Sequence, residues 1–189
     1  MNVLMTGVGG QGIILASDIL SEVMMRAGKD VKKSEIHGMA QRGGSVMSHV
    51  RFGTVVHSPI IPHAECDILL SFEELEAARY MDYLNSGSRV IINQFRLSPP
   101  SVIAGKDSYP DVLPIIRGRT EKVQVVEGSA LAREIGNSRG VNIVLLGVLS
   151  TLLEPAEELW IECLSDMIPA KIREINIKGF KKGRELNRA

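Results

Sequence analysis

The first sixteen residues, from Met1 to Ala16, read MNVLMTGVGGQGIILA and decide the fold class. A short apolar run opens this stretch, four glycines interrupt it, and an apolar helical pattern follows. This order predicts a strand, a tight turn and a helix. Gly7, Gly9 and Gly12 have the spacing G-x-G-x-x-G. Glycine at these positions allows the turn, leaves room for a phosphate, and lets the helix pack closely on the strand.

Two interpretations of this loop remain open. In the first, the segment that also holds Gly10 and Gln11 binds an anionic cofactor group under the positive end of the helix that follows. In the second, the glycines serve only a sharp turn, because such motifs have a known rate of false matches.

The composition favours one domain of medium size with a substantial core. The chain has 189 residues, of which 44% are hydrophobic, and the 22 basic residues balance the 22 acidic ones. Zero net charge and an aromatic content of 4% argue against a nucleic-acid-binding surface. Cys66 and Cys163 are too few and too far apart to hold an iron–sulfur cluster, and we expect both to be buried. A strand at the first residue and the lack of a long apolar run lead us to expect a cytoplasmic protein.

A β-α-β unit is expected to follow the glycine loop. Ile13 to Ala27 has apolar residues at helical spacing, including Ile14 and Leu15, and Asp30 to Ile36 is the expected second strand. In a dinucleotide-binding fold an acidic residue near the end of that strand holds the ribose hydroxyls, and Glu35 is the candidate. Lys32 and Lys33 beside it suit a phosphate better.

The segment after this strand is rich in glycine and polar residues. It includes Gln41, Arg42, Gly43 and Gly44, and it should lie at the carboxyl ends of the strands, where open α/β proteins bind ligands. We favour a binding or docking loop in which Arg42 contacts an anionic group over an ordinary surface loop.

The rest of the chain continues the alternation of strands and helices. We expect a β-hairpin of Val46–Phe52 with Val55–His57, and a Ser71–Glu74 capping box that opens a helix reaching about Leu84. The further expected elements are strands at 67–70, 89–93 and 122–126, a short strand at 101–104 within a long connection, and helices at 130–135, 142–153 and 157–167. A basic segment from Pro169 onward is either a solvated helix end or a docking surface. The whole chain, 1–189, is therefore expected to be one α/β domain with a three-layer, doubly wound, mostly parallel sheet and an added β-hairpin.

The motifs of several enzyme classes are missing from the sequence. It contains no Gly-x-Ser-x-Gly, no His-Glu-x-x-His and no Walker A motif, and the histidines match no zinc signature. Binding architecture without a reacting group indicates a cofactor-dependent oxidoreductase or a subunit that assists a catalytic partner.

Two glycine-rich motifs together carry a family resemblance. Gly7–Gly12, Ser34–Val46 and Ser48–Arg51 resemble the gamma-type subunits of 2-oxoacid:ferredoxin oxidoreductases, and most closely the beta subunit of indolepyruvate oxidoreductases. Further matching positions extend the resemblance over nearly the whole chain: Asp67–Ser71, Glu73–Tyr80, Ile92–Asn93, Asn142 and Leu145–Gly147.

The resemblance implies a fold like domain III of pyruvate-ferredoxin oxidoreductase. It also implies a role in the CoA-dependent oxidative decarboxylation of 2-oxoacids, arylpyruvates among them, with electrons passing to ferredoxin. A catalytic alpha subunit would carry thiamine diphosphate and [4Fe-4S] clusters, and coenzyme A would occupy a shared site. We assign no cofactor to this chain alone.

Two other functions remain open. A free-standing NAD(P)- or flavin-binding dehydrogenase would use the glycine loop together with Glu35. A non-catalytic scaffold would use the loop only as a turn.

Overall fold

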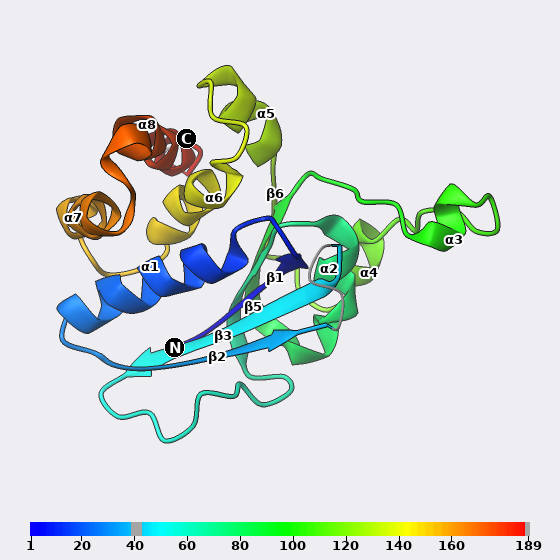
Figure 1. Cartoon of the computed structure of the whole chain (residues 1–189). Coiled ribbons are helices and arrows are strands. Elements are labelled where there is room, and N and C mark those ends of the chain that lie inside the picture. The colour runs from blue at the N-terminus through cyan, green and yellow to red at the C-terminus, as the bar shows by residue number, and fades with distance from the viewer. Residues whose placement is uncertain (39–42, 188–189) are drawn as a thin grey trace.

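A computed structural model describes residues 1–38 and 43–187 of the chain. In the described part, six strands form one sheet in the order β2-β3-β1-β4-β5-β6 (Figure 1). Their bounds are Asn2–Val8 for β1, Asp30–His37 for β2, Ser45–Gly53 for β3, Cys66–Ser71 for β4, Leu84–Asn93 for β5 and Val123–Val126 for β6. β1, β4, β5 and β6 are parallel neighbours, whereas β3 is antiparallel to both β1 and β2.

Helices cover both faces of this sheet, which confirms the three-layer α/β fold. One face packs against α1 (Ile13–Arg26), α6 (Val141–Ser150), α7 (Glu157–Met167) and α8 (Ala170–Glu185). The other face packs against α2 (Glu74–Arg79) and α4 (Leu113–Arg117). The remaining helices are the short α3 (Pro100–Ile103), α5 (Gly128–Glu134) and the 3₁₀ turn η1 (Met81–Tyr83).

The strands alternate between two hydrophobic cores. On β1, Val3 and Met5 face the α1 side and Leu4 faces the α2 side, and all three are fully buried. Because successive side chains of a strand point to opposite faces, an apolar run buried on both sides is what a central strand needs. Both cysteines are buried, as expected. Cys163 lies in the core on the α1 side and Cys66 in the core on the α2 side.

Helix α6 is apolar on all sides because it is enclosed. Its nine residues from Asn142 to Ser150 are buried, and α8 crosses it at very short range. A Cβ atom at Gly147 would lie 2.1 Å from the carbonyl oxygen of Phe180, and one at Gly183 would lie 2.0 Å from that of Val144. Two glycines thus allow the backbones of the two helices to touch.

The antiparallel hairpin is present, but its partner strand differs from our prediction. β3 pairs with β2, from Asp30 opposite Gly53 to His37 opposite Val46, and residues 55–57 form no strand. β3 therefore lies between β1 and β2, so the two strands that flank α1 are not neighbours. The predicted β-α-β unit is wrong in this respect.

Three local predictions also need correction. The helix after β4 ends at Arg79 instead of reaching Leu84, and its cap is Glu73 instead of Ser71. Ser71 ends β4, where its hydroxyl bonds Thr6 Oγ1 at 2.9 Å and the Glu73 carbonyl at 2.7 Å. Residues 100–103 form the helix α3, not a strand.

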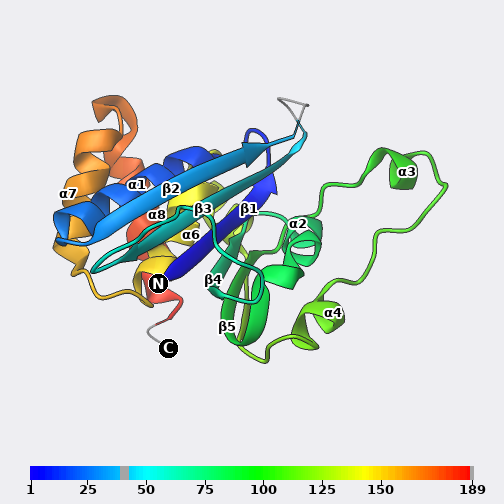
Figure 2. The ribbon, with the colours of Figure 1, turned by 90° about the horizontal axis from the view of Figure 1, so that it is seen from below.

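The connection between β5 and β6 leaves the body of the protein. Figures 1 and 2 show residues 94–112 as an arm that projects away from the sheet with α3 near its tip. Ile103 on this helix is 75% exposed. The long connection in the sequence is thus an extended arm, which we name arm 94–112.

Candidate functional site

The glycine loop between β1 and α1 is held by its own glutamine. The side-chain oxygen Gln11 Oε1 accepts a hydrogen bond from the Val8 backbone amide at 2.7 Å, and the Gln11 backbone amide donates to the Val8 carbonyl at 3.1 Å. A Cβ at Gly7 would lie 2.6 Å from that same Oε1. Gly10 and Gly12 have φ angles of 103° and 79°, which favour glycine. The turn therefore needs several of its glycines for local reasons.

The two glycine-rich loops meet at the carboxyl edge of the sheet. The Gly9 amide donates to the Gly44 carbonyl at 2.8 Å, and the Gly38 amide donates to the Ser45 carbonyl at 3.0 Å. The described ends of the glycine-rich loop that was predicted to follow the second strand, Gly38 and Gly44, therefore lie at the same sheet edge as the first loop. Gly44 belongs to this junction and Gly43 precedes it with a φ angle of 76°, whereas Gln41 and Arg42 lie outside the described residues. The binding role of both loops stays a prediction.

A cavity of about 480 Å³ opens on the hairpin side of the glycine loop. The first turn of α1 forms one wall with Ile14 and Leu15, and His37 and Val46 from the hairpin form the other. Ile14 and Leu15 are 41% and 37% exposed. Their spacing in the sequence had predicted a place in the apolar core of the helix. Both residues instead line a surface cavity.

Glu35 does not occupy the position that ribose recognition requires. β3 lies between β2 and β1 in the sheet. Because neighbouring strands are about 5 Å apart, the strand that carries Glu35 is roughly 10 Å from β1. Its carboxylate bonds Lys33 Nζ at 2.6 Å and lies 3.6 Å from His37 Nε2. Lys33 also pairs with Asp18 of α1. This geometry disfavours the dehydrogenase alternative.

A second cavity, of about 370 Å³, opens on the other side of the glycine loop and is here called the arginine pocket. Its walls come from the glycine loop, the ends of β4 and β5, α5 and the start of α6. The lining residues are Gly10, Gln11, Phe72, Asn93, Phe95, Ser129, Arg133, Ser138, Arg139 and Val141. β1 is followed by α1 on one face and β4 by α2 on the other, and such a switch point is where open α/β sheets bind ligands.

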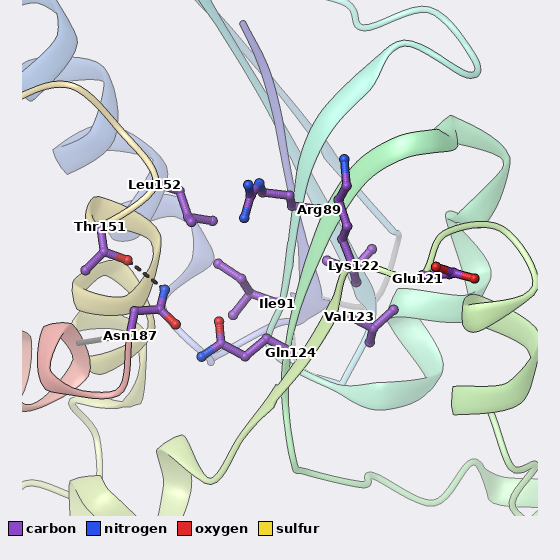
Figure 3. Close-up of a pocket in the computed structure, with 10 residues that line it drawn as sticks. Arg89, Ile91, Glu121, Lys122, Val123, Gln124, Thr151, Leu152 and Asn187 are labelled. Carbon is purple, nitrogen blue, oxygen red and sulfur yellow. Dashed lines mark hydrogen bonds between the residues drawn. The ribbon is translucent and has the colours of Figure 1, made fainter. Parts of the chain in front are cut away.

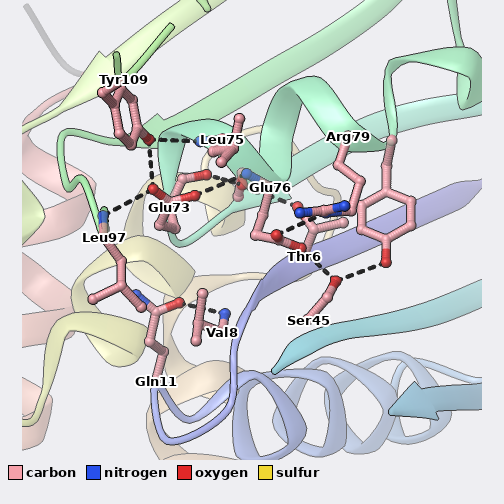
Figure 4. Close-up of polar contacts among 12 residues, drawn as sticks. Thr6, Val8, Gln11, Ser45, Glu73, Leu75, Glu76, Arg79, Leu97 and Tyr109 are labelled. Carbon is pink, nitrogen blue, oxygen red and sulfur yellow. Dashed lines mark hydrogen bonds and ion pairs between the residues drawn. The ribbon is translucent and has the colours of Figure 1, made fainter. Parts of the chain in front are cut away.

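A group of acidic residues lies at the start of α2. The sequence had not indicated that they act together. Glu73 is 1% exposed and accepts three hydrogen bonds: from the Glu76 amide at 2.8 Å, the Leu97 amide at 3.0 Å and the Tyr109 hydroxyl at 2.6 Å (Figure 4). Burial and the neighbouring Glu73 carboxylate raise the pKa of Tyr109. Glu73 therefore joins both stems of arm 94–112 to the sheet.

Two further buried carboxylates extend this group. Glu74 pairs with Arg96 at 2.7 Å, and Glu76 pairs with Arg79 at 2.8 Å. Glu76 also accepts a hydrogen bond from the Ser45 hydroxyl, which lies 2.8 Å from the Tyr80 hydroxyl (Figure 4). The hairpin end is thereby tied to α2. The run of acids at 73–76 was the available signal, but it was interpreted as a helix cap alone.

A third cavity, of about 470 Å³, lies at the opposite ends of the strands. Figure 3 shows Arg89 and Gln124 from the sheet facing Asn187, whose side-chain amide donates to Thr151 Oγ1 at 2.7 Å. Lys122 at its rim donates to the Gly87 carbonyl at 3.3 Å. Because ligands of open α/β sheets bind at the carboxyl ends of the strands, we do not place the functional site here.

Metal and membrane sites were also sought. Among residues 1–38 and 43–187, no cluster of histidine, cysteine, aspartate or glutamate has the arrangement of a metal site. Every helix in the described ranges is too short or too polar to cross a lipid bilayer.

Comparisons with known proteins agree with this architecture. The indolepyruvate oxidoreductase subunit IorB of Archaeoglobus fulgidus is 38% identical over 97% of this chain and 93% of its own length. The gamma subunit of a keto/oxoacid ferredoxin oxidoreductase from Geobacter sulfurreducens has the same fold, with a TM-score of 0.73, 23% identity and coverage of 97% and 96% of the two chains.

A 2-oxoglutarate:ferredoxin oxidoreductase from Magnetococcus marinus, solved with 2-oxoglutarate, coenzyme A and succinyl-CoA, aligns over 100% of this chain and 31% of its own. The TM-score is 0.77 at 23% identity. The family model described as pyruvate ferredoxin/flavodoxin oxidoreductase matches residues 2–186. The chain therefore belongs to the pyruvate ferredoxin/flavodoxin oxidoreductase family and is a subunit of a 2-oxoacid:ferredoxin oxidoreductase.

Proposed function

We propose that this chain is the gamma-type subunit of an indolepyruvate-type oxidoreductase and contributes its glycine loop to a coenzyme A site shared with a catalytic subunit. The enzyme would convert a 2-oxoacid anion, CoA and two oxidised ferredoxins to an acyl-CoA, carbon dioxide, two reduced ferredoxins and the proton released from the CoA thiol. The 38% identity to a subunit named for indolepyruvate supports the substrate class. The cytoplasm remains the proposed location.

The catalytic partner is proposed to supply the redox chemistry. Thiamine diphosphate activates the 2-oxoacid when bound, and [4Fe-4S] clusters carry the electrons. Clusters of this kind need several thiolates, and the sequence has two cysteines, which lie in separate cores. Burial raises the pKa of the Cys66 thiol to about 12, so this thiol is a poor metal ligand.

One observation carries the proposal for coenzyme A: the hydrogen bond from the Gly9 amide to the Gly44 carbonyl. It brings two glycine-rich segments, far apart in sequence, to one edge of the sheet beside the start of α1. A Cβ at Gly10 would have no atom within 4 Å, so a ligand group can approach the backbone there. The α1 N-terminus has no side-chain cap, and its first amides favour an anion. These features fit the phosphates of coenzyme A.

The role of the chain's own residues is to bind and orient. The loop amides would hold an anionic group, and the partner subunit would complete the site. This division agrees with the sequence, which contains no Gly-x-Ser-x-Gly, His-Glu-x-x-His or Walker A motif.

The first experiment is co-purification of this chain from its native source, followed by identification of the accompanying polypeptide. A partner with thiamine diphosphate and iron–sulfur clusters, and CoA-dependent reduction of ferredoxin with an arylpyruvate, are the expected results. Full turnover by the chain alone would refute the proposal.

The second experiment tests the loop within the assembled complex. Gly9→Asp places a carboxylate where the anion should bind, and we expect the KM for CoA to rise by an order of magnitude or more. Gly53→Asp is the matched control, because Gly53 lies at the opposite end of β3, where a Cβ would meet no atom within 4 Å. Calorimetry that finds CoA binding and complex assembly unchanged by Gly9→Asp would instead support a scaffold role. Arg42→Ala extends the test to the hairpin loop.

A further inference from the structure

Arm 94–112 lacks the burial that normally keeps a chain segment ordered. Residues 94–111 are all exposed or half-buried, and Val112 is the first buried side chain after them. The helix α3, near the tip of the arm, buries none of its residues. Ordering a segment costs conformational entropy, which buried apolar surface normally offsets. The surface that would bury these side chains is therefore not part of the described chain.

The base of the arm, in contrast, is held firmly against the sheet (Figure 4). Glu73 accepts from the Leu97 amide on the outgoing stem and from the Tyr109 hydroxyl on the returning stem. The same hydroxyl accepts the Leu75 amide at 3.0 Å, and the Arg96 guanidinium lies 5.1 Å from the centre of the Tyr109 ring. Hydrogen bonds to a buried carboxylate and a cation–π contact fix the direction in which the arm leaves the sheet. A fixed base with an unburied tip indicates a segment that contacts another molecule.

Three large apolar side chains are exposed along the arm. Phe95 is 36%, Leu97 43% and Ile103 75% exposed, and Ile103 is the most exposed large apolar residue of the described part of the chain. Single exposed apolar residues are ordinary, but three along one projecting segment are typical of an interaction surface.

The charges of the arm favour a protein as its partner. Two basic and two acidic residues balance: Arg96, Lys106, Asp107 and Asp111. A nucleic acid or an anionic membrane would attract an excess of basic residues. The arm therefore fits an apolar protein surface.

The place where the arm begins indicates which protein covers it. Phe95 lines the arginine pocket, so the arm starts at the rim of the site at the carboxyl edge of the sheet. Figure 1 shows the arm extending on the side to which the carboxyl end of β1 points. A subunit that completes a site at this edge therefore lies against the arm as well.

We propose that arm 94–112 docks into an apolar groove of the catalytic subunit, with Ile103 inserted into the groove and Leu97 at the rim of the shared site. This inference rests on the proposed function, which supplies the partner and its position. The arm holds that subunit over the carboxyl edge of the sheet, and the contact needs no bound cofactor. A second copy of this chain is the other candidate for the groove, and the test distinguishes the two.

The first test measures assembly of the complex with Ile103→Asp. Because the side chain is 75% exposed, the isolated variant should unfold at the wild-type temperature, whereas a carboxylate in an apolar groove is costly. We expect the Kd of the complex, from analytical ultracentrifugation over a dilution series, to rise about tenfold or more. At concentrations at which the complex is intact, its kcat and its KM for CoA should stay unchanged.

Val55→Asp is the matched control for this substitution. Val55 is 64% exposed and follows β3, whose last residues lie beside the first residues of β1, at the opposite edge of the sheet. Its variant should assemble like the wild type.

The second test identifies the polypeptide that the arm contacts. Cys66 and Cys163 are fully buried, so a benzophenone maleimide should react selectively with Ile103→Cys in the folded chain. The labelled chain is assembled with its partner and irradiated, and the cross-linked peptides are identified by mass spectrometry. We expect a link from position 103 to the catalytic subunit and none from a labelled Val55→Cys variant.

Three outcomes would overturn the inference: a link from position 103 to a second copy of this chain, an equal yield from position 55, or an Ile103→Asp complex as stable as the wild type. Wild-type turnover together with any of them would leave the proposed function intact. If the complex assembles through the arm but shows no CoA-dependent turnover, the proposed coenzyme A site fails and the docking role of the arm is kept.

Discussion

Replacing Glu73 by glutamine should destabilise the protein far more than its conservative chemistry suggests. The carboxylate is buried and receives three donors, two of them on arm 94–112. Glutamine keeps one acceptor oxygen and gains an NH₂ group. Whichever way the amide is turned, the NH₂ group faces a backbone N–H, either that of Glu76 or that of Leu97.

The size of the effect follows from these contacts. A hydrogen bond to a charged group contributes about 1.5–3 kcal/mol, and an unsatisfied buried donor costs about 1–3 kcal/mol. Because these terms overlap, we expect the free energy of unfolding to fall by about 2–4 kcal/mol. For a domain of this size the Tm should fall by roughly 4–16 °C.

Urea unfolding of the purified chain, followed by circular dichroism, measures this change. Glu65→Gln is the matched control, since Glu65 is exposed, and its effect should stay within about 0.5 kcal/mol. Tyr109→Phe removes one partner of Glu73, so a double-mutant cycle with Glu73→Gln should show a coupling of about 1 kcal/mol. A Glu73→Gln variant as stable as the control would refute the role given to this carboxylate.

Three further predictions follow from the packing and the buried groups. Gly147→Ala should lower the free energy of unfolding by about 1–3 kcal/mol, despite a gain in helix propensity, because its Cβ would lie 2.1 Å from the Phe180 carbonyl oxygen. Unchanged urea unfolding would contradict the close crossing of α6 and α8. Burial raises the pKa of Cys66 to about 12, so the unfolded chain loses the thiol proton at a lower pH than the folded protein, and the free energy of unfolding should fall as the pH rises from about 9 towards 12. Cys66→Ala should make this fall with pH less steep in urea titrations repeated across that pH range. An equally steep fall in the variant would show that Cys66 is not its cause. Gln11→Ala removes the acceptor of the Val8 amide, whose hydrogen exchange should then accelerate at least tenfold, whereas unchanged protection would show that Gln11 does not fix the turn.

Elements with local signals could be predicted from the sequence. The apolar runs at 68–70 and 90–92 form β4 and β5, and the amphipathic pattern at 157–167 forms α7 with Trp160 fully buried. Such runs leave few other ways of burying the same side chains. The order of β2 and β3 in the sheet could not be predicted from such local signals. Gly53-Thr54 resembled a hairpin turn, whereas β3 pairs with β2, and residues 38–44 connect these two strands.

The arginine pocket could not be predicted from the sequence either. Asn93, Arg133 and Arg139 come from two strand–helix segments and are individually ordinary. Only the sheet order brings them to the glycine loop, and that order depends on long-range pairing that no short motif records. The glycine loop itself was visible because its requirements are local.

The structure also divides the glycines of that loop between the two interpretations that the sequence left open. Gly7 and Gly12 serve the turn, since a Cβ at each would lie 2.6 Å from Gln11 Oε1 and Asn142 Nδ2, respectively. Gly9 serves the junction with the hairpin through its amide. Gly10 has open space around the position of a Cβ and lines a cavity on either side. Substitutions at Gly7 or Gly12 should therefore lower stability before they affect any ligand. Gly10 also has a φ angle of 103°, so a side chain there strains the turn, and a Gly10 variant separates a turn from a binding loop only when its free energy of unfolding and its ligand affinity are both measured.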